Sequence, residues 1–544
     1  ANTLTLTAAN ELNINAVMTA GGSAGLAINA RPWDNDGRYG IINTGMGNGG
    51  FVGRVDFTGS DNTITINGTS SIIITTLGSE GGYCDDSGLQ GLKLVNGGYV
   101  LGADIDATPT ASWNGGAGFR PLGTNCGVYA QFVPRIEGMG HTIDGLTINR
   151  PTEDTVGLAR VLTEGASNLG LTNVNIVGRN AVGALGGFNS DSHVYRFSNI
   201  YITGSVTGVN SVGGLIGRAW NTTSPIGSYN LITNVYVDAN VSGNMLVGGL
   251  FGYSSIAVRV DGAYTTGTVS GASQVGGLIG TMEYWSQVIT NVHSTATVIS
   301  SWDGNGTIGY VPEYTTSSIH LTYFDGLLNI ASWLCDPLNS DWKLTIPEPR
   351  AHYYNGDTVH TCSTTAPIDS LYTTPLTNAQ MKQQASYAGF DFTNTWVIYE
   401  GQTTPILRKM EGLFDSDGDG YYNNEDAFPG DPTRWLATPD AFPFAAQTGV
   451  ATIAEITSNT ITVSGINVAT PISIASCTGS NCQYAINGGD WRSDAGTVKN
   501  GDTVQVRQTS SGSDATQTNL TLTIGDVSET FSVTTEAAPV APVD

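Results

Sequence analysis

The chain has 544 residues, of which 12% are charged, and its formal net charge is −25. Because a polyanion repels phosphate backbones, this charge argues against nucleic acid as a partner. No apolar stretch approaches the roughly 20 residues that a membrane-spanning helix needs. The 71 glycines, with 40% hydrophobic residues recurring at strand spacing, favour an all-β protein of several domains.

The cysteines fall into pairs of sequence neighbours, and none forms a CxxC motif or lies beside a histidine cluster. We therefore expect local disulfides formed in an oxidising compartment. The sequence begins with Ala1 rather than Met, as it would after removal of a signal peptide. Together these features predict a secreted protein at the cell surface. The expected pairs are Cys84 with Cys126, Cys335 with Cys362, and Cys477 with Cys482.

Short alternating strands punctuated by glycine and asparagine are predicted from residue 1 to about residue 80, for example Leu4–Thr7 and Thr63–Asn67. This texture resembles the repetitive β-helix of filamentous-haemagglutinin-type exoproteins. The following segments Gly98–Asp106 and Ile136–Ile148 resemble the lead-in of bacterial surface proteins that carry GLUG repeats. The resemblance implies a β-helical exoprotein of the adhesin type.

The repeats occupy roughly residues 150 to 310, and variants of one Gly-Leu-hydrophobic-Gly phrase mark them. The phrases start 26, 30, 35 and 28 residues apart, at Val156, Val182, Val212, Val247 and Val275. A second phrase, a polar residue followed by Asn and an alternating strand, begins at Ser198, Thr233 and Thr290. Two strands in each unit of about 30 residues predict stacked parallel coils over residues 1–315, with apolar residues inside and Asn and Thr paired from coil to coil.

Residues 316–412 leave the repeat and are predicted to form a cap with a short helix. Thr377 and Gln380 make a capping-box signal before an expected helix at Met381–Ala385. Aromatic segments follow, including Phe390–Phe392 and Trp396–Tyr399. The ending resembles the segment that closes GLUG arrays, so we expect it to cover the open edge of the last coil.

A calcium-binding linker is predicted at residues 413–436. Carboxylates at loop positions 1, 3, 5 and 12, with glycine at position 6, match a Ca²⁺ loop. The continuation to Pro432 resembles thrombospondin type 3 or dockerin-like loops more than an EF-hand, and its place between domains suggests a calcium-stiffened hinge. The expected side-chain ligands are Asp415, Asp417, Asp419 and Asp426, with the backbone oxygen of Tyr421 and the further candidates Asn423 and Asp431.

Alternating strands between turn signals predict an immunoglobulin-like β-sandwich at residues 437–535. The turn signals include Asn487–Gly489 and Asn500–Asp502. A proline-rich extended tail follows at residues 536–544.

The sequence argues against an enzyme. The histidines never form HExxH, and isolated acid pairs such as Asp104 and Asp106 show no register from coil to coil. Gly21–Gly25 has the letters of a nucleophile elbow around Ser23, but a glycine-rich turn between strands explains it.

We therefore predict an extracellular structural or adhesive rod that assembles head to tail with copies of itself and contacts host or surface glycans. The alternative is a β-helix that binds or cleaves glycans, with Trp220, Tyr284 and Trp285 as sugar platforms. A third reading makes the chain a passenger fragment of a larger exoprotein.

Overall fold

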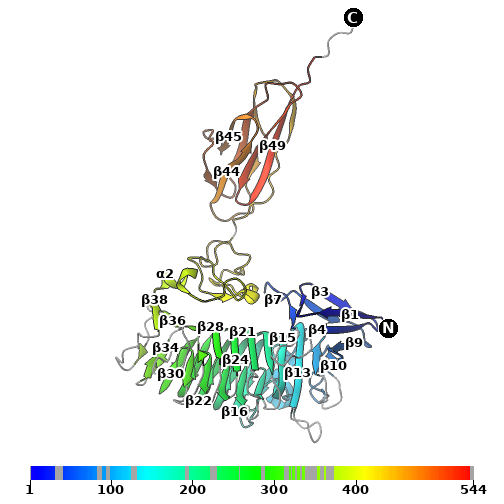
Figure 1. Ribbon diagram of the computed structural model, residues 1–544, viewed down its shortest axis with the longest axis vertical. Coiled ribbons are helices and arrows are strands. Elements are labelled where there is room, and N and C mark those ends of the chain that lie inside the picture. Colours follow the sequence, from blue (N-terminus) through cyan, green and yellow to red (C-terminus); the bar gives the residue numbers. More distant parts are fainter. Residues whose placement is uncertain are drawn as a thin grey trace. The chain divides into compact units, whose positions relative to one another are not determined.

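The computed structural model describes residues 2–539 apart from 31–40, 83–87, 93–97, 124–131, 190–194, 221–229, 256–257, 284–287, 311–317, 320–321, 325–327, 331–333, 337–351, 356–360, 363–372 and 436. For the strands between residues 318 and 374, it describes backbone pairing alone. The chain divides into two compact units, Ala1–Phe414 and Asp415–Asp544. Strands dominate both units, and no helix in the described part is long and apolar enough to cross a membrane (Figure 1).

Parallel strands stacked from repeat to repeat form the first unit (Figure 1). Each pairs with the strand that follows roughly one repeat later, so equivalent residues lie side by side. The longest row contains β13 (Phe132–Asp144), β15 (Ala159–Val177), β18 (Arg196–Thr207), β21 (Asn230–Ser242), β24 (Val258–Thr266) and β28 (Val288–Ser294).

Other strands of each repeat form further rows, of which two follow the glycine phrase. One contains β17 (Gly186–Asn189), β20 (Ile216–Trp220), β23 (Phe251–Ser255), β27 (Ile279–Met282) and β31 (Ile308–Tyr310). The other is a separate six-stranded sheet of β16 (Asn180–Gly183), β19 (Asn210–Gly213), β22 (Met245–Gly248), β26 (Ser273–Gly276), β30 (Asp303–Asn305) and β35 (Leu334–Asp336).

The parallel pairing continues beyond residue 315, where we had placed the end of the repeats. Strands β33 (Thr322–Phe324), β36 (His352–Asn355) and β38 (Thr373–Leu376) extend the longest row. The boundary predicted from the sequence is therefore too early, because the strands continue after the glycine phrase has ended.

The glycine phrase lies where two backbones approach closely. A Cβ on Gly213 would overlap the carbonyl oxygen of Ile216 and lie 2.6 Å from that of Leu250 in the next repeat. The residue before each Val of the phrase adopts a left-handed conformation, for example Ser211 at φ 55°. The phrase therefore provides a tight corner, and its Val and Leu side chains fill the interior.

Asparagines form a second repeated corner. Asn168, Asn199, Asn234 and Asn291 all have φ between 51° and 53°, a region that asparagine tolerates better than most residues. Asn199 Nδ2 donates to Asn168 Oδ1 at 3.0 Å, and Asn210 Nδ2 donates to Asn180 Oδ1 at 3.1 Å. The predicted pairing of polar side chains from repeat to repeat is thus confirmed at these positions.

An aromatic row runs along the outer side of the longest row of strands. Tyr201, Tyr236, Tyr264 and His293 are in register on successive strands. The Tyr264 and His293 rings stack with centroids 4.6 Å apart. Because parallel pairing aligns equivalent residues, one aromatic position per repeat becomes a continuous apolar strip.

Residues 376–414 cover this strip. Phe414 lies 4.8 Å from the Tyr236 ring, and buried Trp396 meets His293 edge-on at 6.2 Å. The carbonyl oxygen of Gly412 accepts a hydrogen bond from Gly49 N–H near the N-terminal strands. This segment therefore lies along the side of the stacked strands, whereas we had expected it to cover the edge of the last coil.

The helix in this segment lies earlier in the sequence than the predicted Met381–Ala385. The capping box of Thr377 and Gln380 is present, but α2 spans only Asn378–Met381. A separate 3₁₀ turn at Gln384–Ser386 follows it. Met381 and Tyr387 are both buried against the aromatic strip, so packing rather than intrinsic helix propensity sets this length.

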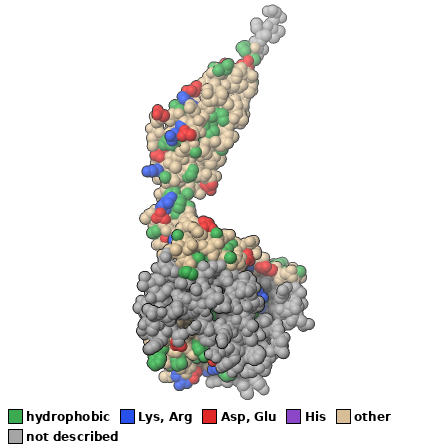
Figure 2. Space-filling model, turned by 60° about the vertical axis from the view of Figure 1, so that its left-hand side comes forward, with side chains coloured by type: hydrophobic (Ala, Val, Ile, Leu, Met, Phe, Trp, Pro, Cys, Tyr) green, Lys and Arg blue, Asp and Glu red, His purple; other side chains and the backbone are tan. Residues whose placement is uncertain are grey.

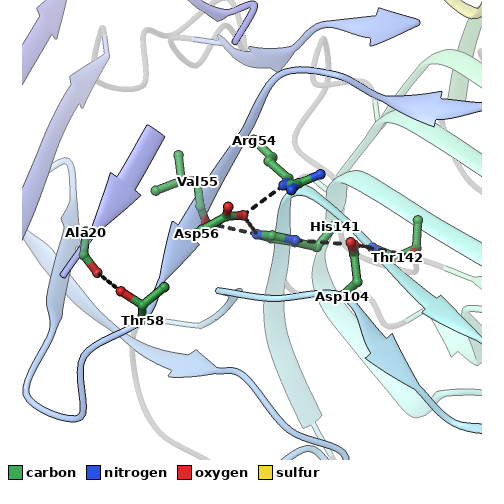
Figure 3. Close-up of polar contacts among 8 residues, drawn as sticks. All are labelled: Ala20, Arg54, Val55, Asp56, Thr58, Asp104, His141 and Thr142. Carbon is green, nitrogen blue, oxygen red and sulfur yellow. Dashed lines mark hydrogen bonds and ion pairs between the residues drawn. The ribbon is translucent and has the colours of Figure 1, made fainter. Parts of the chain in front are cut away.

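The N-terminal strands dock on the same sheet through His141 on β13 (Figure 3). Its Nε2 lies 2.9 Å from the carbonyl oxygen of Val55, on β8 (Arg54–Phe57), and 3.6 Å from Asp56 Oδ1. Its Nδ1 lies 3.3 Å from Asp104 Oδ1. Both ring nitrogens face oxygen atoms of other segments. The buried His141 therefore joins three separate segments.

The second unit contains two sheets around one apolar core. One sheet contains β41 (Gln447–Val450), β44 (Thr470–Cys477), β46 (Gly496–Val498), β48 (Gln517–Ile524) and β49 (Val527–Thr535). The other contains β42 (Glu455–Thr457), β43 (Ile461–Thr462), β45 (Ser480–Ile486) and β47 (Thr503–Thr509). Charged side chains are scattered over the visible surface of this unit (Figure 2).

Substituting Gly213 with alanine should destabilise the first unit by about 3 kcal/mol or more, because the new Cβ overpacks against two backbones. Thermal unfolding measures this loss. The matched control is Gly81→Ala, since no atom lies within 4 Å of a Cβ there. Its stability should stay within about 0.5 kcal/mol of the parent, and equal effects of the two substitutions would contradict the steric explanation.

The buried His293 should make the first unit less stable in acid. Burial lowers its pKa from 6.5 to about 3, although its hydrogen bond to the Pro405 carbonyl opposes this shift. The unfolded chain therefore binds a proton below pH 6.5 that the folded chain excludes. Between pH 6 and 4, His293 should therefore lower the free energy of unfolding by up to about 1.4 kcal/mol for each pH unit of acidification.

Comparing acid unfolding of the parent with that of His293→Phe isolates this contribution, since the other titrating groups are common to both proteins. The variant should have a flatter stability profile over that range. Parallel profiles would show that His293 does not cause the acid sensitivity.

Candidate metal centre

Three carboxylates converge at the start of the second unit. Oxygen atoms of Asp415, Asp417 and Asp419 all lie within 4.8 Å of one another. The described part of residues 415–446 contains no helix or strand, so the loop depends on its own hydrogen bonds. Carboxylates that alternate in the sequence thus lie close together in the turn.

Backbone N–H groups shape this turn around the carboxylates. Gly418 and Gly420 donate to the two oxygens of Asp415 at 2.8 and 2.9 Å, and Tyr421 donates to Asp419 Oδ1 at 2.8 Å. Gly418 and Gly420 have φ values of 79° and 96°, which a side chain would strain. Glycine at these positions is therefore a requirement of the loop.

Three carboxylate oxygens in this region are buried and accept no hydrogen bond from the described residues. They are the Oδ2 atoms of Asp417, Asp419 and Asp426. Asp426 is only 5% exposed, and its other oxygen accepts from Phe428 N–H at 2.7 Å. Uncompensated buried carboxylate oxygens are costly, so they indicate a site for a cation.

The electrostatics agree with this interpretation. Burial, together with the neighbouring carboxylates, raises the pKa of Asp417 and the pKa of Asp426. A divalent cation would relieve both the desolvation and the mutual repulsion. An all-oxygen ligand set suits a hard cation such as Ca²⁺. The residues present therefore fit calcium.

The two further candidates, Asn423 and Asp431, have hydrogen-bond partners within the loop. Asn423 is 1% exposed and binds Ser416 through both ends of its amide, at 2.9 and 2.8 Å. Asp431 Oδ1 accepts from Thr433 Oγ1 at 2.7 Å, while its backbone N–H donates to the Phe428 carbonyl oxygen at 3.0 Å. Both residues thus support the loop in this structure. The Tyr421 ring stacks on Trp435 with centroids 5.3 Å apart.

One predicted disulfide is confirmed. Cys477 and Cys482 are bonded with their Cα atoms 6.3 Å apart, and they join the end of β44 to β45. Cys84 and Cys126 lie outside the described residues. Cys335 and Cys362 lie in β35 and in β37 (Thr361–Cys362), where only the backbone is described.

The residues considered for catalysis are scattered. Ser23 lies in a turn between β3 (Val17–Ala20) and β4 (Gly25–Ala30), without the helix of a nucleophile elbow. His141 and His293 are buried in separate structural contacts, and the remaining histidines lie outside the described residues or in strands described only by their backbone.

Of the predicted sugar platforms, Trp220 is described and 38% exposed, whereas Tyr284 and Trp285 lie outside the described residues. The sequence analysis missed Arg218, whose guanidinium lies 4.0 Å from the Trp220 ring centroid. Aligning the glycine phrases would have revealed it, because Arg218 and Tyr253 follow equivalent glycines in successive repeats.

Calcium should stabilise the second unit through Asp426. At a concentration 100-fold above its dissociation constant, calcium should raise the free energy of unfolding by about 2.7 kcal/mol. Thermal unfolding in the presence of calcium and of a chelator measures this difference. Asp426→Asn keeps the oxygen that Phe428 needs but should remove most of this stabilisation. The matched control is Asp431→Asn, which should retain it. The opposite ranking of the two variants would overturn the ligand assignment.

No family model matches the chain. It is 43% identical over 126 residues to halomucin of Haloquadratum walsbyi, covering 22% of this chain and 1% of halomucin. It is 29% identical over 130 residues to an immunoglobulin A1 protease of Streptococcus sanguinis, covering 24% of this chain and 6% of the protease.

The chain thus matches only a small part of either curated relative. A solved structure named for an immunoglobulin A1 protease of Bacteroides ovatus shares 16% identity at a TM-score of 0.39, with 63% of this chain and 93% of that one covered. These similarities assign neither a family nor an activity to the chain.

Proposed function

We propose that the chain is an extracellular structural or adhesive protein whose parallel sheets wind as a β-helix of the GLUG-repeat type. The observation that carries this proposal is the continuous interior of the first unit. Val, Leu and Ile from successive repeats form one buried cluster between Ile74 and Ile308. A continuous core built from successive repeats is typical of proteins that provide length and display surfaces.

The N-terminal strands support assembly with a second copy of the chain. Each pairs on one side only among the described residues: β1 (Thr3–Ala8) with β4, β2 (Glu11–Ile14) with β5 (Ile41–Thr44), and β3 with β8. Leu4 and Val17 are 52% and 49% exposed, and β1 carries no charge. Uncharged edge strands readily pair with another strand.

Head-to-tail addition would preserve the polarity of the sheets. Because the rows are parallel, a strand at the far end of one copy can pair with β1 of the next in the same direction. Such a contact joins two different surfaces and can repeat without closing, which produces a filament. The other copy is therefore the partner that these edges fit.

The second unit adds a display module to this rod. We interpret its two sheets as an immunoglobulin-like sandwich, with calcium ordering the loop that precedes it. The Cys477–Cys482 disulfide favours an oxidising, extracellular setting. The proposal contains no catalytic step. The protease named among the relatives shares only 6% of its length with this chain.

A second candidate function is glycan binding by the first unit. The specific observation is the exposed Trp220 ring, beside which the Arg218 guanidinium lies. An aromatic ring next to a hydrogen-bonding group is an arrangement that suits a polyhydroxylated ligand. This candidate is compatible with an adhesive rod, since binding would occur on its side.

Leu4→Lys should prevent filament formation by the full chain, because a charge on an edge strand opposes pairing. Electron microscopy in calcium, over a range of protein concentrations, measures the outcome. Ile453→Lys is the matched control, since Ile453 is 74% exposed in the second unit and should not affect assembly. Dispersed monomers from the parent at every concentration would refute the filament proposal.

A further inference from the structure

Arg218 lies between two aromatic rings on the side of the first unit. Its guanidinium carbon is 4.0 Å from the Trp220 centroid and 5.0 Å from the Tyr253 centroid. Arg218 and Tyr253 are in register on the neighbouring strands β20 and β23, and Trp220 follows two residues after Arg218 on the same face. Strand pairing therefore fixes the positions of all three side chains.

Arg218, like Arg196, has a buried Nε without a hydrogen-bond partner among the described residues. The described residues provide no hydrogen bond or ion pair to the Arg218 guanidinium. By contrast, Arg179, Arg259 and Arg507 each lie within 3.0 Å of a carboxylate oxygen. In a chain with a net charge of −25, a guanidinium without an ion-pair partner among the described residues offers a fork-shaped donor to an external anion.

A hydrogen bond in the next repeat fixes the second ring. The Tyr253 hydroxyl donates to Glu283 Oε2 at 2.6 Å, and Glu283 N–H donates to the Ser254 carbonyl at 2.8 Å. Burial raises the pKa of Tyr253 to about 12, and Glu283 contributes to this shift. Tyr253 therefore remains a neutral donor, and its ring is held against the guanidinium.

We propose that Arg218, Trp220 and Tyr253 form a subsite for a carboxylated sugar, such as a uronic acid residue of an acidic polysaccharide. The planar guanidinium would bind the carboxylate through two hydrogen bonds. The exposed Trp220 ring would pack against the C–H face of the sugar. This inference rests on the glycan-binding candidate and specifies the ligand class.

Charge favours a sugar carboxylate over a polyphosphate. The strongly acidic chain repels dense anions such as nucleic acids, and Glu283 lies beside the subsite. A single carboxylate on a hydroxylated ring brings one negative charge to one unpaired arginine. The hydroxyl groups of the sugar can also donate hydrogen bonds to a nearby carboxylate such as that of Glu283.

The test is calorimetric titration of the full chain with an oligomer of glucuronic acid, with the matched glucose oligomer, and with acetate. Only the glucuronic acid oligomer offers both a sugar ring and a carboxylate. It should therefore bind at least about 10-fold more tightly than the other two ligands, because one bidentate charged contact contributes roughly this factor in affinity. Acetate binding as tightly as the oligomer would overturn the sugar assignment in favour of a simple carboxylate, such as that of a peptide.

Variants locate the contact. Arg218→Gln and Trp220→Ala should each weaken binding of the acidic oligomer about 10-fold or more. Arg218→Lys should also lose most of the affinity, because lysine keeps the charge but lacks the planar fork. The matched controls are Arg179→Gln, which removes a paired arginine, and Trp302→Ala, which removes a 70% exposed tryptophan far along the sequence. Both controls should bind like the parent.

The outcomes also separate this inference from the function on which it rests. Equal binding of the glucose and glucuronate oligomers, unchanged in Arg218→Gln, would refute the carboxylate subsite and leave glycan binding intact. No binding of either oligomer, with a blank glycan array, would refute both. Unfolding curves that match the parent show that each variant is folded, so a lost signal reports on the subsite.

Discussion

The parallel register between successive repeats is the constraint on which the first unit depends. Because each strand pairs with its equivalent one repeat later, every position in the repeat becomes a row of neighbours. A glycine needed at one corner is needed at all of them, and an outward tyrosine becomes a strip of aromatic rings. The register thus converts a weakly repeated sequence into continuous surfaces.

Those surfaces explain where the non-repeated segments lie. The strip from Tyr201 to His293 is apolar, and Phe51 and Phe414 come from distant parts of the chain to cover it. His141 and Asn168 add polar contacts to the N-terminal strands, with Asn168 Oδ1 accepting from Thr44 N–H at 3.1 Å. Burying the strip removes a large exposed apolar area from water, which gives the first unit its compactness.

The candidate metal centre and the proposed sugar subsite use opposite electrostatic arrangements. In the loop, several carboxylates lie close together, and the buried oxygens lack donors. At Arg218, a guanidinium packs against two aromatic rings, and its Nε is buried without an acceptor among the described residues. In both places a charged group is held without its usual partner, which is the local property that a ligand of opposite charge can use.

The sequence by itself determined local features: the strand repeats, the clustered Asp415, Asp417 and Asp419, the Thr377 capping box and the Cys477–Cys482 pair. These features depend on residues close together in the chain, so their spacing identifies them. Only the tertiary structure decided that residues 376–414 lie along the aromatic strip, that the strands continue past residue 315, and that Asn423 supports the loop. Each of these outcomes depends on which distant side chains compete for the same surface or hydrogen bond, and spacing along the chain does not contain that information.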